Sequence, residues 1–170
     1  MLSLDLVDKG VVTNQIVLTV GYDKESLADG HYTGEVVCDH YGRKIPKHAH
    51  GTQNLGRHTS STRKITDAAM ALFDRIIDKT LLARRLNLTA CNVIREEDIP
   101  EIESYEQISL FDMAEAANAD NNAEEKERAL QEAMLLIKHK YGKNAILKGT
   151  NYTEGATARE RNRSIGGHKA

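Results

Sequence analysis

Alternation of apolar and other residues over residues 15–22 is the clearest pattern in the chain. Ile16, Leu18, Val20 and Tyr22 fall on one side of an extended chain, and smaller or polar residues separate them. Because side chains alternate across a strand, this segment predicts a strand with one buried face. The pattern also predicts strands over residues 52–59 and 84–93, and a hairpin around residues 34–39.

Apolar spacing of three and four residues predicts the helices. The clearest one carries its apolar residues from Ile65 to Ile76, and residues 60–62 offer N-caps for it, with Thr66-Asp67 as an alternative cap. A short helical stub at residues 2–7 ends before Gly10. So little helix precedes this glycine that we expect Met1 to begin either a truncated frame or the last part of a longer protein.

These elements predict an α+β fold, a small open antiparallel or mixed sheet with helices on one face. We assign this domain to residues 1–95. An acidic tether follows over residues 96–122, then an amphipathic helix over 123–142 and a basic, flexible tail over 143–170. The apolar stripe of the second helix consists of Leu130, Met134, Ile137 and Tyr141.

The second face of the predicted sheet is polar and basic. In the last strand the apolar side holds Leu86, Leu88 and Ala90, and the other side holds Arg85, Asn87, Thr89 and Cys91. Nothing in the sequence predicts an element that covers this second face. Arg, Asn and Thr side chains can hold DNA phosphates, so the face is a candidate nucleic-acid surface.

Charge is segregated along the chain although the formal net charge is only −2. All charged side chains between residues 41 and 64 are basic, whereas acids dominate residues 96–127. This favours one surface facing a polyanion, with an ordinary solvated surface as the alternative. Tyr41 is the one aromatic residue of the basic stretch, which favours contact with a duplex backbone over base stacking. Two cysteines and no signal peptide or long apolar run indicate a cytoplasmic protein without a disulfide framework.

A metal site or an active site finds little support in the motifs. His48 and His50 could share a face of a strand, near Cys38, Asp39 and His40, but the paired spacing usual for structural zinc is absent, which favours local phosphate contact or plain surface exposure over a metal site. The chain has no Walker loop and no carboxylate pair in a catalytic setting. We therefore expect no catalytic residue, metal or cofactor in this chain.

A docking peptide is predicted within the acidic tether. Its sequence is Gln107-Ile108-Ser109-Leu110-Phe111, and its flanks are crowded with Glu, Asp, Asn and Ala. A large apolar pair on a polar tether becomes useful when a partner supplies a pocket for it. The alternative is a turn that packs back on the domain.

Three strings carry a family resemblance. They are residues 15–23 (Gln-Ile-Val-Leu-Thr-Val-Gly-Tyr-Asp), residues 42–52 (Gly-Arg-Lys-Ile-Pro-Lys-His-Ala-His-Gly-Thr) and residues 54–57 (Asn-Leu-Gly-Arg) before the capped helix. They resemble the C-terminal "little finger" of Y-family translesion DNA polymerases, closest to the UmuC/UvrX-like DNA-repair branch of Gram-positive bacteria. Residues 140–149 and the ending Ile-Gly-Gly-His-Lys-Ala resemble the tail of that branch.

The resemblance implies a partner for each surface. A little finger lies along primer-template DNA, and the matching residues here are Arg57, Thr59, Ser60, Arg84 and Arg85; the basic stretch adds Arg43, Lys44 and Lys47. The family's peptide similar to residues 107–111 binds the replication sliding clamp. Membrane contact is not expected.

The catalytic part of the family is not seen in this chain. The resemblance implies that the palm, fingers and thumb, with the acidic residues that hold two Mg²⁺ ions, lie upstream of this chain's first residue. It implies the same for the first strand of the little finger and half of its first helix. We therefore expect DNA holding and clamp docking in translesion synthesis or the SOS response, without polymerase activity unless the catalytic part binds. A free-standing adaptor that binds clamp or DNA is the alternative.

Overall fold

The computed structural model describes residues 2–28, 30–99, 113–165 and 168–169. The chain forms two compact units, Met1–Glu106 and Gln107–Ala170.

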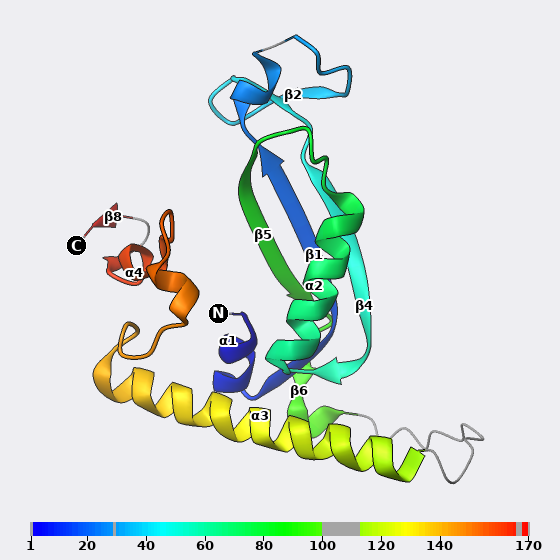
Figure 1. The fold of residues 1–170 in the computed structure, drawn as a ribbon, viewed down its shortest axis with the longest axis vertical. Helices are drawn as coiled ribbons and strands as arrows, with labels where there is room; N and C mark the ends of the chain where they lie inside the picture. Colours follow the sequence, from blue (N-terminus) through cyan, green and yellow to red (C-terminus); the bar gives the residue numbers. More distant parts are fainter. Residues whose placement is uncertain (1, 29, 100–112, 166–167, 170) are drawn as a thin grey trace. The chain divides into compact units, whose positions relative to one another are not determined.

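An antiparallel sheet forms the centre of the first unit (Figure 1). Strand β1 (Val11–Tyr22) lies in the middle, with β4 (Ala49–Thr59) on one side and β5 (Ala83–Cys91) on the other. The short β6 (Ile94–Arg95) pairs with the first residues of β1. The predicted strand over residues 15–22 is confirmed within β1, because its even-numbered residues from Ile16 to Tyr22 are buried and the residues between them are not.

Helices α1 (Leu2–Asp8) and α2 (Thr62–Ile76) cover one face of this sheet. Leu72 of α2 packs against Leu18 and Val20, while Ile65 of α2 and Leu6 of α1 pack against Ile16. The predicted α+β layer with helices on one face is therefore confirmed. Leu86 differs from the expectation because it is 58% exposed, since α2 lies over β1 and β4 rather than over the beginning of β5.

Helix α2 packs unusually close to β4 because a glycine lies beneath it. Gly51 lies opposite Leu18 in the register and faces the helix. A Cβ atom at Gly51 would lie 2.8 Å from Cδ1 of Leu72 and 2.9 Å from Cγ2 of Ile76. The missing side chain thus sets the distance between helix and sheet.

Ser61 is the N-cap of α2. Its side-chain oxygen accepts a hydrogen bond from the backbone N–H of Lys64 at 3.2 Å, and its backbone is extended. The prediction of a cap within residues 60–62 is confirmed. The alternative cap at Thr66-Asp67 is wrong, because both residues lie inside the helix.

A small lobe connects β1 to β4. It holds the 3-10 helix η1 (Lys24–Leu27) and a hairpin of β2 (Val36–Cys38) and β3 (Lys44–Pro46), all beyond one end of the sheet (Figure 1). The hairpin predicted around residues 34–39 exists, but its turn comes later, over residues 39–43. Asp39 explains this position, because its carboxylate accepts hydrogen bonds from the backbone N–H groups of Tyr41 and Arg43.

The second unit is built around the long helix α3 (Met113–Tyr141). It begins well before residue 123, so residues 113–122 are helical rather than part of a linker. The sequence from Met113 is rich in Ala and Glu, which are strong helix formers, and the acidity of the segment hid this propensity. Gly142, with φ of +93°, ends the helix as the sequence predicts.

The tail after α3 contains local structure. It forms η3 (Gly149–Tyr152), α4 (Ala158–Arg161) and a hairpin of β7 (Ser164–Ile165) and β8 (His168–Lys169). The side-chain amide of Asn162 donates a hydrogen bond to the side-chain oxygen of Asn144 at 2.8 Å.

The last described element of the first unit is η2 (Glu96–Asp98), which follows β6. None of the described helices is long and apolar enough to span a membrane.

Candidate nucleic-acid interface

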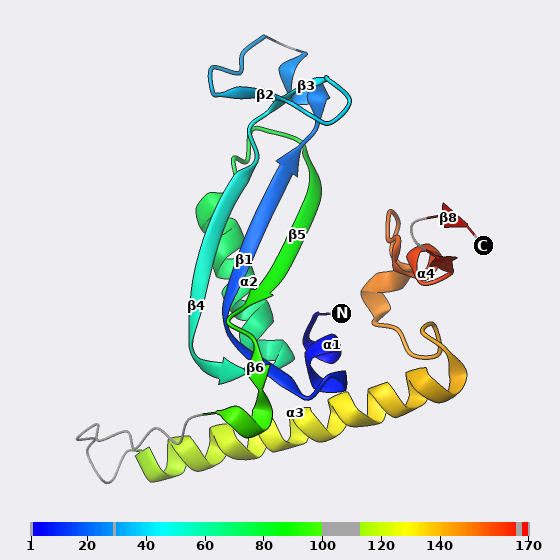
Figure 2. The ribbon, with the colours of Figure 1, turned by 180° about the vertical axis from the view of Figure 1, so that it is seen from behind.

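The sheet face opposite the helices is the candidate interface, and we call it the open face. Figure 2 shows it with α2 lying behind the strands, and no helix of the described first unit lies over it. The register sorts its side chains into rows across β5, β1 and β4. From the lobe end these rows are Arg85–Gly21, Asn87–Thr19–His50, Thr89–Val17–Thr52 and Cys91–Gln15–Asn54.

The chemistry of the open face is that of a hydrogen-bond donor surface. None of the residues in these four rows is acidic, and most are Asn, Gln or Thr. Side chains of this kind can donate to phosphate oxygens without reading base sequence. The short side chains also leave the surface low enough for a bulky polyanion to approach.

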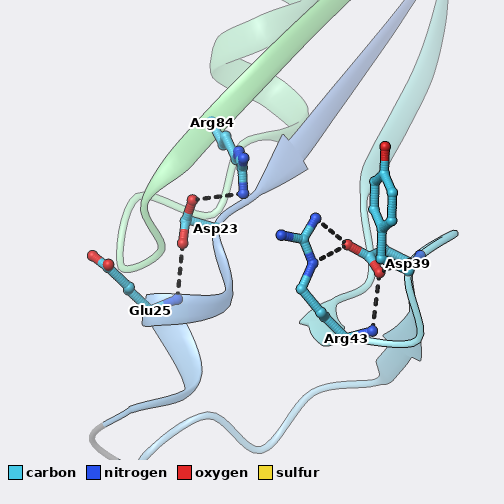
Figure 3. A network of polar contacts seen from close by, with 6 residues as sticks. Asp23, Glu25, Asp39, Arg43 and Arg84 are labelled. Atoms are coloured by element: carbon cyan, nitrogen blue, oxygen red, sulfur yellow. Dashed lines mark hydrogen bonds and ion pairs between the residues drawn. The ribbon is translucent and has the colours of Figure 1, made fainter.

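Arg85 is the cation of the open face. It lies opposite Gly21, and no hydrogen bond or ion pair engages its guanidinium within the described part of the chain. Its neighbour Arg84 is the extra residue of a bulge, since Gly21 pairs with Arg85 and Tyr22 with Ala83. Arg84 instead forms an ion pair with Asp23 at 3.3 Å (Figure 3). The sequence predicts that both arginines contact DNA, whereas in the structure Arg84 is paired with Asp23 and Arg85 has no such partner among the described residues.

His50 belongs to the open face; the sequence offers phosphate contact as one alternative for this residue but does not include it among the predicted DNA-binding residues of the sheet. It lies opposite Thr19, and the Thr19 hydroxyl lies 3.1 Å from Nδ1 of its ring. The signal that could have found it is the alternation of β4, in which residues 50, 52 and 54 are exposed and their neighbours are partly covered. The strand predicted from the sequence starts at residue 52, whereas β4 starts at Ala49, so the prediction does not include His50.

Of the three lobe residues predicted to contact DNA, Arg43, Lys44 and Lys47, two are paired with acids. Arg43 bonds to Asp39 at 2.6 Å, and Lys47 bonds to Glu35 at 2.6 Å. Lys44 has no such partner among the described residues. Pairing reduces the net attraction of Arg43 and Lys47 for a phosphate, so the lobe contributes less charge than its sequence suggests.

The turn of the lobe is held by one carboxylate (Figure 3). The Arg43 side chain and backbone N–H, together with the backbone N–H of Tyr41, donate to Asp39 and hold the pKa of that carboxyl below its usual value. In return the bond to Asp39 raises the pKa of Arg43. The Arg43 guanidinium lies 5.0 Å from the centre of the exposed Tyr41 ring. This arrangement orders the turn locally.

The residues predicted beside the second strand fall in two environments. Thr59 and Ser60 are only 7% and 8% exposed, and the Thr59 hydroxyl accepts a hydrogen bond from the backbone N–H of Ser61 at 3.0 Å. Their side chains therefore support the start of α2 and are not surface contacts. Arg57 is exposed, in the irregular end of β4 where the register shifts.

Metal and catalytic chemistry find no supporting cluster. In the part of the chain that the structure describes, no three His, Cys, Asp or Glu side chains come together to hold a metal ion. A lowered carboxyl pKa is seen at Asp39 and also at Asp78, where hydrogen bonds from Thr80 are the cause. Both shifts arise from turn-forming contacts, which have a structural explanation.

The predicted clamp-binding residues Gln107, Ile108, Ser109, Leu110 and Phe111 lie outside the described residues. Their assignment rests on the sequence alone.

Comparison with known proteins gives one family and two relatives. The model of the impB/mucB/samB family C-terminal domain matches residues 1–110. The chain is 31% identical over 160 residues to the UV-damage repair protein UvrX of Bacillus subtilis, covering 94% of this chain and 30% of UvrX. It is 28% identical over 125 residues to DNA polymerase IV 2 of Halalkalibacterium halodurans, covering 74% of this chain and 26% of that protein. The chain thus spans less than a third of either relative. No solved structure matches it.

Proposed function

We propose that this chain, which belongs to the impB/mucB/samB C-terminal domain family and corresponds to the C-terminal part of a Y-family DNA polymerase, holds duplex DNA against its open face. The observation that carries the proposal is a sheet face that no described helix of the first unit covers, with neutral donors along its length and, at one end, Arg85, which has no ion-pair partner among the described residues. DNA repair is the setting that the name of its relative UvrX indicates.

The open face suits backbone contact rather than base readout. Arg85 supplies charge, and amide and hydroxyl groups supply hydrogen bonds to phosphate and sugar oxygens. A shallow face with short side chains does not reach deep into a groove to compare bases. Binding should therefore be nearly independent of sequence, which suits a polymerase that must move along any template.

Holding DNA, rather than nucleotidyl transfer, is the role that we assign to the chain. Its motifs include no pair of carboxylates placed for two Mg²⁺ ions, and the polymerase reaction is a property that we propose only for an assembly with the catalytic part. We also propose that this assembly acts in the cytoplasm, in translesion synthesis that responds to DNA damage. Lesion choice would depend on the catalytic part.

Clamp docking through residues 107–111 is the second part of the proposal. Leu110 and Phe111 would fill an apolar pocket of the sliding clamp, and Gln107 would bind a polar subsite beside it. Burial of the two apolar side chains would contribute about 1.5–3 kcal/mol each before ordering costs. A modest affinity of this kind works by raising the local concentration of the DNA-binding unit at the replication site.

A free-standing adaptor is the competing function. Such an adaptor would occupy clamp or DNA and exclude a polymerase, whereas a polymerase part would support synthesis when the catalytic part is supplied. A primer-extension assay with a separately expressed palm, fingers and thumb separates the two. Stimulation by the chain favours the polymerase part, and inhibition favours the adaptor.

The neighbouring arginines of β5 offer a matched test of DNA holding. We expect Arg85→Gln to weaken duplex binding about fivefold and to lower the slope of log K against log salt by about 0.9, because one phosphate contact is lost. Arg84→Gln should have a smaller effect, since Asp23 already pairs with Arg84. Fluorescence anisotropy at several salt concentrations measures both. An equal loss in the two variants, or none in either, contradicts the assignment.

A further inference from the structure

A gap interrupts the open face at Gly21. Every other position of β1 on this face carries a side chain, namely Gln15, Val17 and Thr19, whereas Gly21 carries none. Arg85 lies directly opposite on β5. In an antiparallel sheet, residues opposite each other lie about 4.5–5.5 Å apart, so Arg85 forms one wall of the gap.

The remaining walls of the gap are donors from the adjacent row. Asn87, Thr19 and His50 form that row, and Asn87 and His50 are diagonal neighbours of Gly21, at about 7–8 Å. When the Thr19 hydroxyl donates to Nδ1 of His50, the neutral ring carries its proton on Nε2. The neutral imidazole then offers its one N–H, at Nε2, as a donor in addition to the Arg85 guanidinium.

The fold itself does not require a glycine at position 21. Its φ does not lie in the left-handed region that favours glycine, and the extra residue of the neighbouring bulge is Arg84 on β5. A Cβ atom would meet Cβ of Arg85 at 3.6 Å and its carbonyl oxygen at 3.8 Å, which are ordinary contacts. Gly51 differs, because a Cβ there would collide with α2.

A glycine in a strand interior weakens the strand and often marks a close approach by a ligand or another backbone. The rows Arg85–Gly21 and Asn87–Thr19–His50 hold hydrogen-bond donors and no acid, and the carboxylate of Asp23, two residues after Gly21, is paired with Arg84. Such a set fits a tetrahedral anion better than a base or an acidic side chain.

We propose that the gap at Gly21 seats one phosphodiester group of the bound DNA, held by Arg85 and by the imidazole of His50. This inference rests on the proposed DNA-holding function and adds the point at which the DNA backbone comes closest to the sheet. The Arg85 guanidinium supplies the electrostatic attraction to the phosphodiester group and two N–H donors for its oxygens. Thr19 is a positioning residue, because it acts through the tautomer of His50.

Substitutions at Gly21 test the phosphate seat, because they should lower DNA affinity without lowering the stability of the fold. In the full chain, Gly21→Ala and Gly21→Val should melt at the same or a higher temperature, since a Cβ atom there makes only ordinary contacts and strands favour Val. Duplex affinity should nevertheless fall about threefold with Ala and about tenfold with Val. The salt slope of the Val variant should also decrease by about 0.9, as expected for one lost phosphate contact.

Gly149→Val is the matched control, because a Cβ at Gly149 has nothing within 4 Å and its φ is not left-handed. Its affinity should equal that of the unmodified chain. A double variant with Arg85→Gln should lose less than the product of the two single losses, since both changes remove the same phosphate. Thr19→Val should weaken binding about twofold, whereas Thr19→Ser, which keeps the hydroxyl beside Nδ1 of His50, should bind as the unmodified chain does.

The outcomes distinguish the two levels of the proposal. Unchanged affinity in folded Gly21→Ala and Gly21→Val overturns the phosphate seat while leaving DNA binding in place. If the unmodified chain does not bind duplex DNA at low salt, the proposed function fails and the seat fails with it. Full additivity of Gly21→Val and Arg85→Gln also overturns the seat.

Discussion

Two glycines of the sheet show how one residue type serves opposite purposes on opposite faces. Gly51 faces α2, and its missing side chain lets Leu72 and Ile76 approach β4 closely. Gly21 faces away from the helices, where a side chain would fit. The alternation of the strands predicts which face each glycine occupies, but only the helix position shows that Gly51 is a packing residue.

Gly51→Val should destabilise the first unit. The added side chain would force α2 away from the sheet, and overpacking of this kind costs about 1–3 kcal/mol. Denaturant unfolding of the two variants, followed by circular dichroism, measures the effect beside Gly21→Val, which should not lose stability. Similar losses in both variants would contradict the assignment of Gly51 to packing.

The lobe turn makes a pH prediction at Asp39. Its folded pKa is lowered, chiefly by the Arg43 hydrogen bond, so its contribution to stability is present above the unfolded value near 3.8. This contribution is lost as the pH falls through the lower folded pKa. A carboxyl-carbon NMR titration should give Asp39 a pKa below 3.8, and Arg43→Gln should bring it back toward that value. An unchanged titration in the variant would contradict the pairing.

At the scale of elements, periodicity predicts the centre of the sheet well and its edges poorly. The regular alternation of β1 identifies it, because one face is buried along most of its length. Strand β4 contains Gly51 and Gly56 and an irregular register after Asn54, so its alternation is weaker and its start is predicted late. His50 was missed for that reason.

Arg84 and Arg85 show a limit of a different kind. A regular strand would place the two side chains on opposite faces, and the sequence does not reveal the bulge that lets Arg84 reach Asp23. A long-range ion pair depends on where the chain after β1 turns. The open face as a whole was predictable, but the division between free and paired cations required the structure.

The cap of α2 gives a prediction at the scale of one element. Ser61→Ala should destabilise the first unit by about 1 kcal/mol, because the N–H of Lys64 loses its acceptor. Thr66→Ala is the matched control, since Thr66 lies exposed inside the helix, where Ala is the better helix former. Denaturation midpoints of the two variants provide the measurement. A greater loss with Thr66→Ala would mean that the helix begins later than the structure places it.

At the scale of the whole molecule, the two proposed tasks fall to two different units of the chain. The open face belongs to Met1–Glu106, while the proposed clamp peptide belongs to the second unit by sequence. Weak DNA binding and weak clamp binding give a higher overall affinity when one chain carries both sites, because binding at one site raises the local concentration of the other. Charge and composition predict separate DNA-binding and clamp-binding segments, and this division stays a prediction, whereas the start of α3 at Met113 shows that part of the acidic segment is helical.

The clamp proposal is tested by removing its apolar pair. Leu110→Ala together with Phe111→Ala should abolish capture of the chain by an immobilised sliding clamp, because the peptide would lose both anchors. Duplex affinity should not change in this variant. Leu136→Ala, an exposed apolar residue of α3, is the control for general loss of apolar surface. Undiminished capture by the double variant would rule out this peptide as the docking site.

The central claim is that DNA lies on the open face, and the chain's two cysteines test it most directly. Cys91 lies on that face opposite Gln15, and Cys38 lies in the lobe hairpin. Alkylation rates of both thiols can be measured by mass spectrometry in a single sample, with and without saturating duplex DNA at low salt. We expect DNA to slow the alkylation of Cys91 at least about fivefold more than that of Cys38, and salt to reverse the effect. Protection of Cys38 alone, or an unchanged rate at Cys91 in the bound complex, would contradict the account.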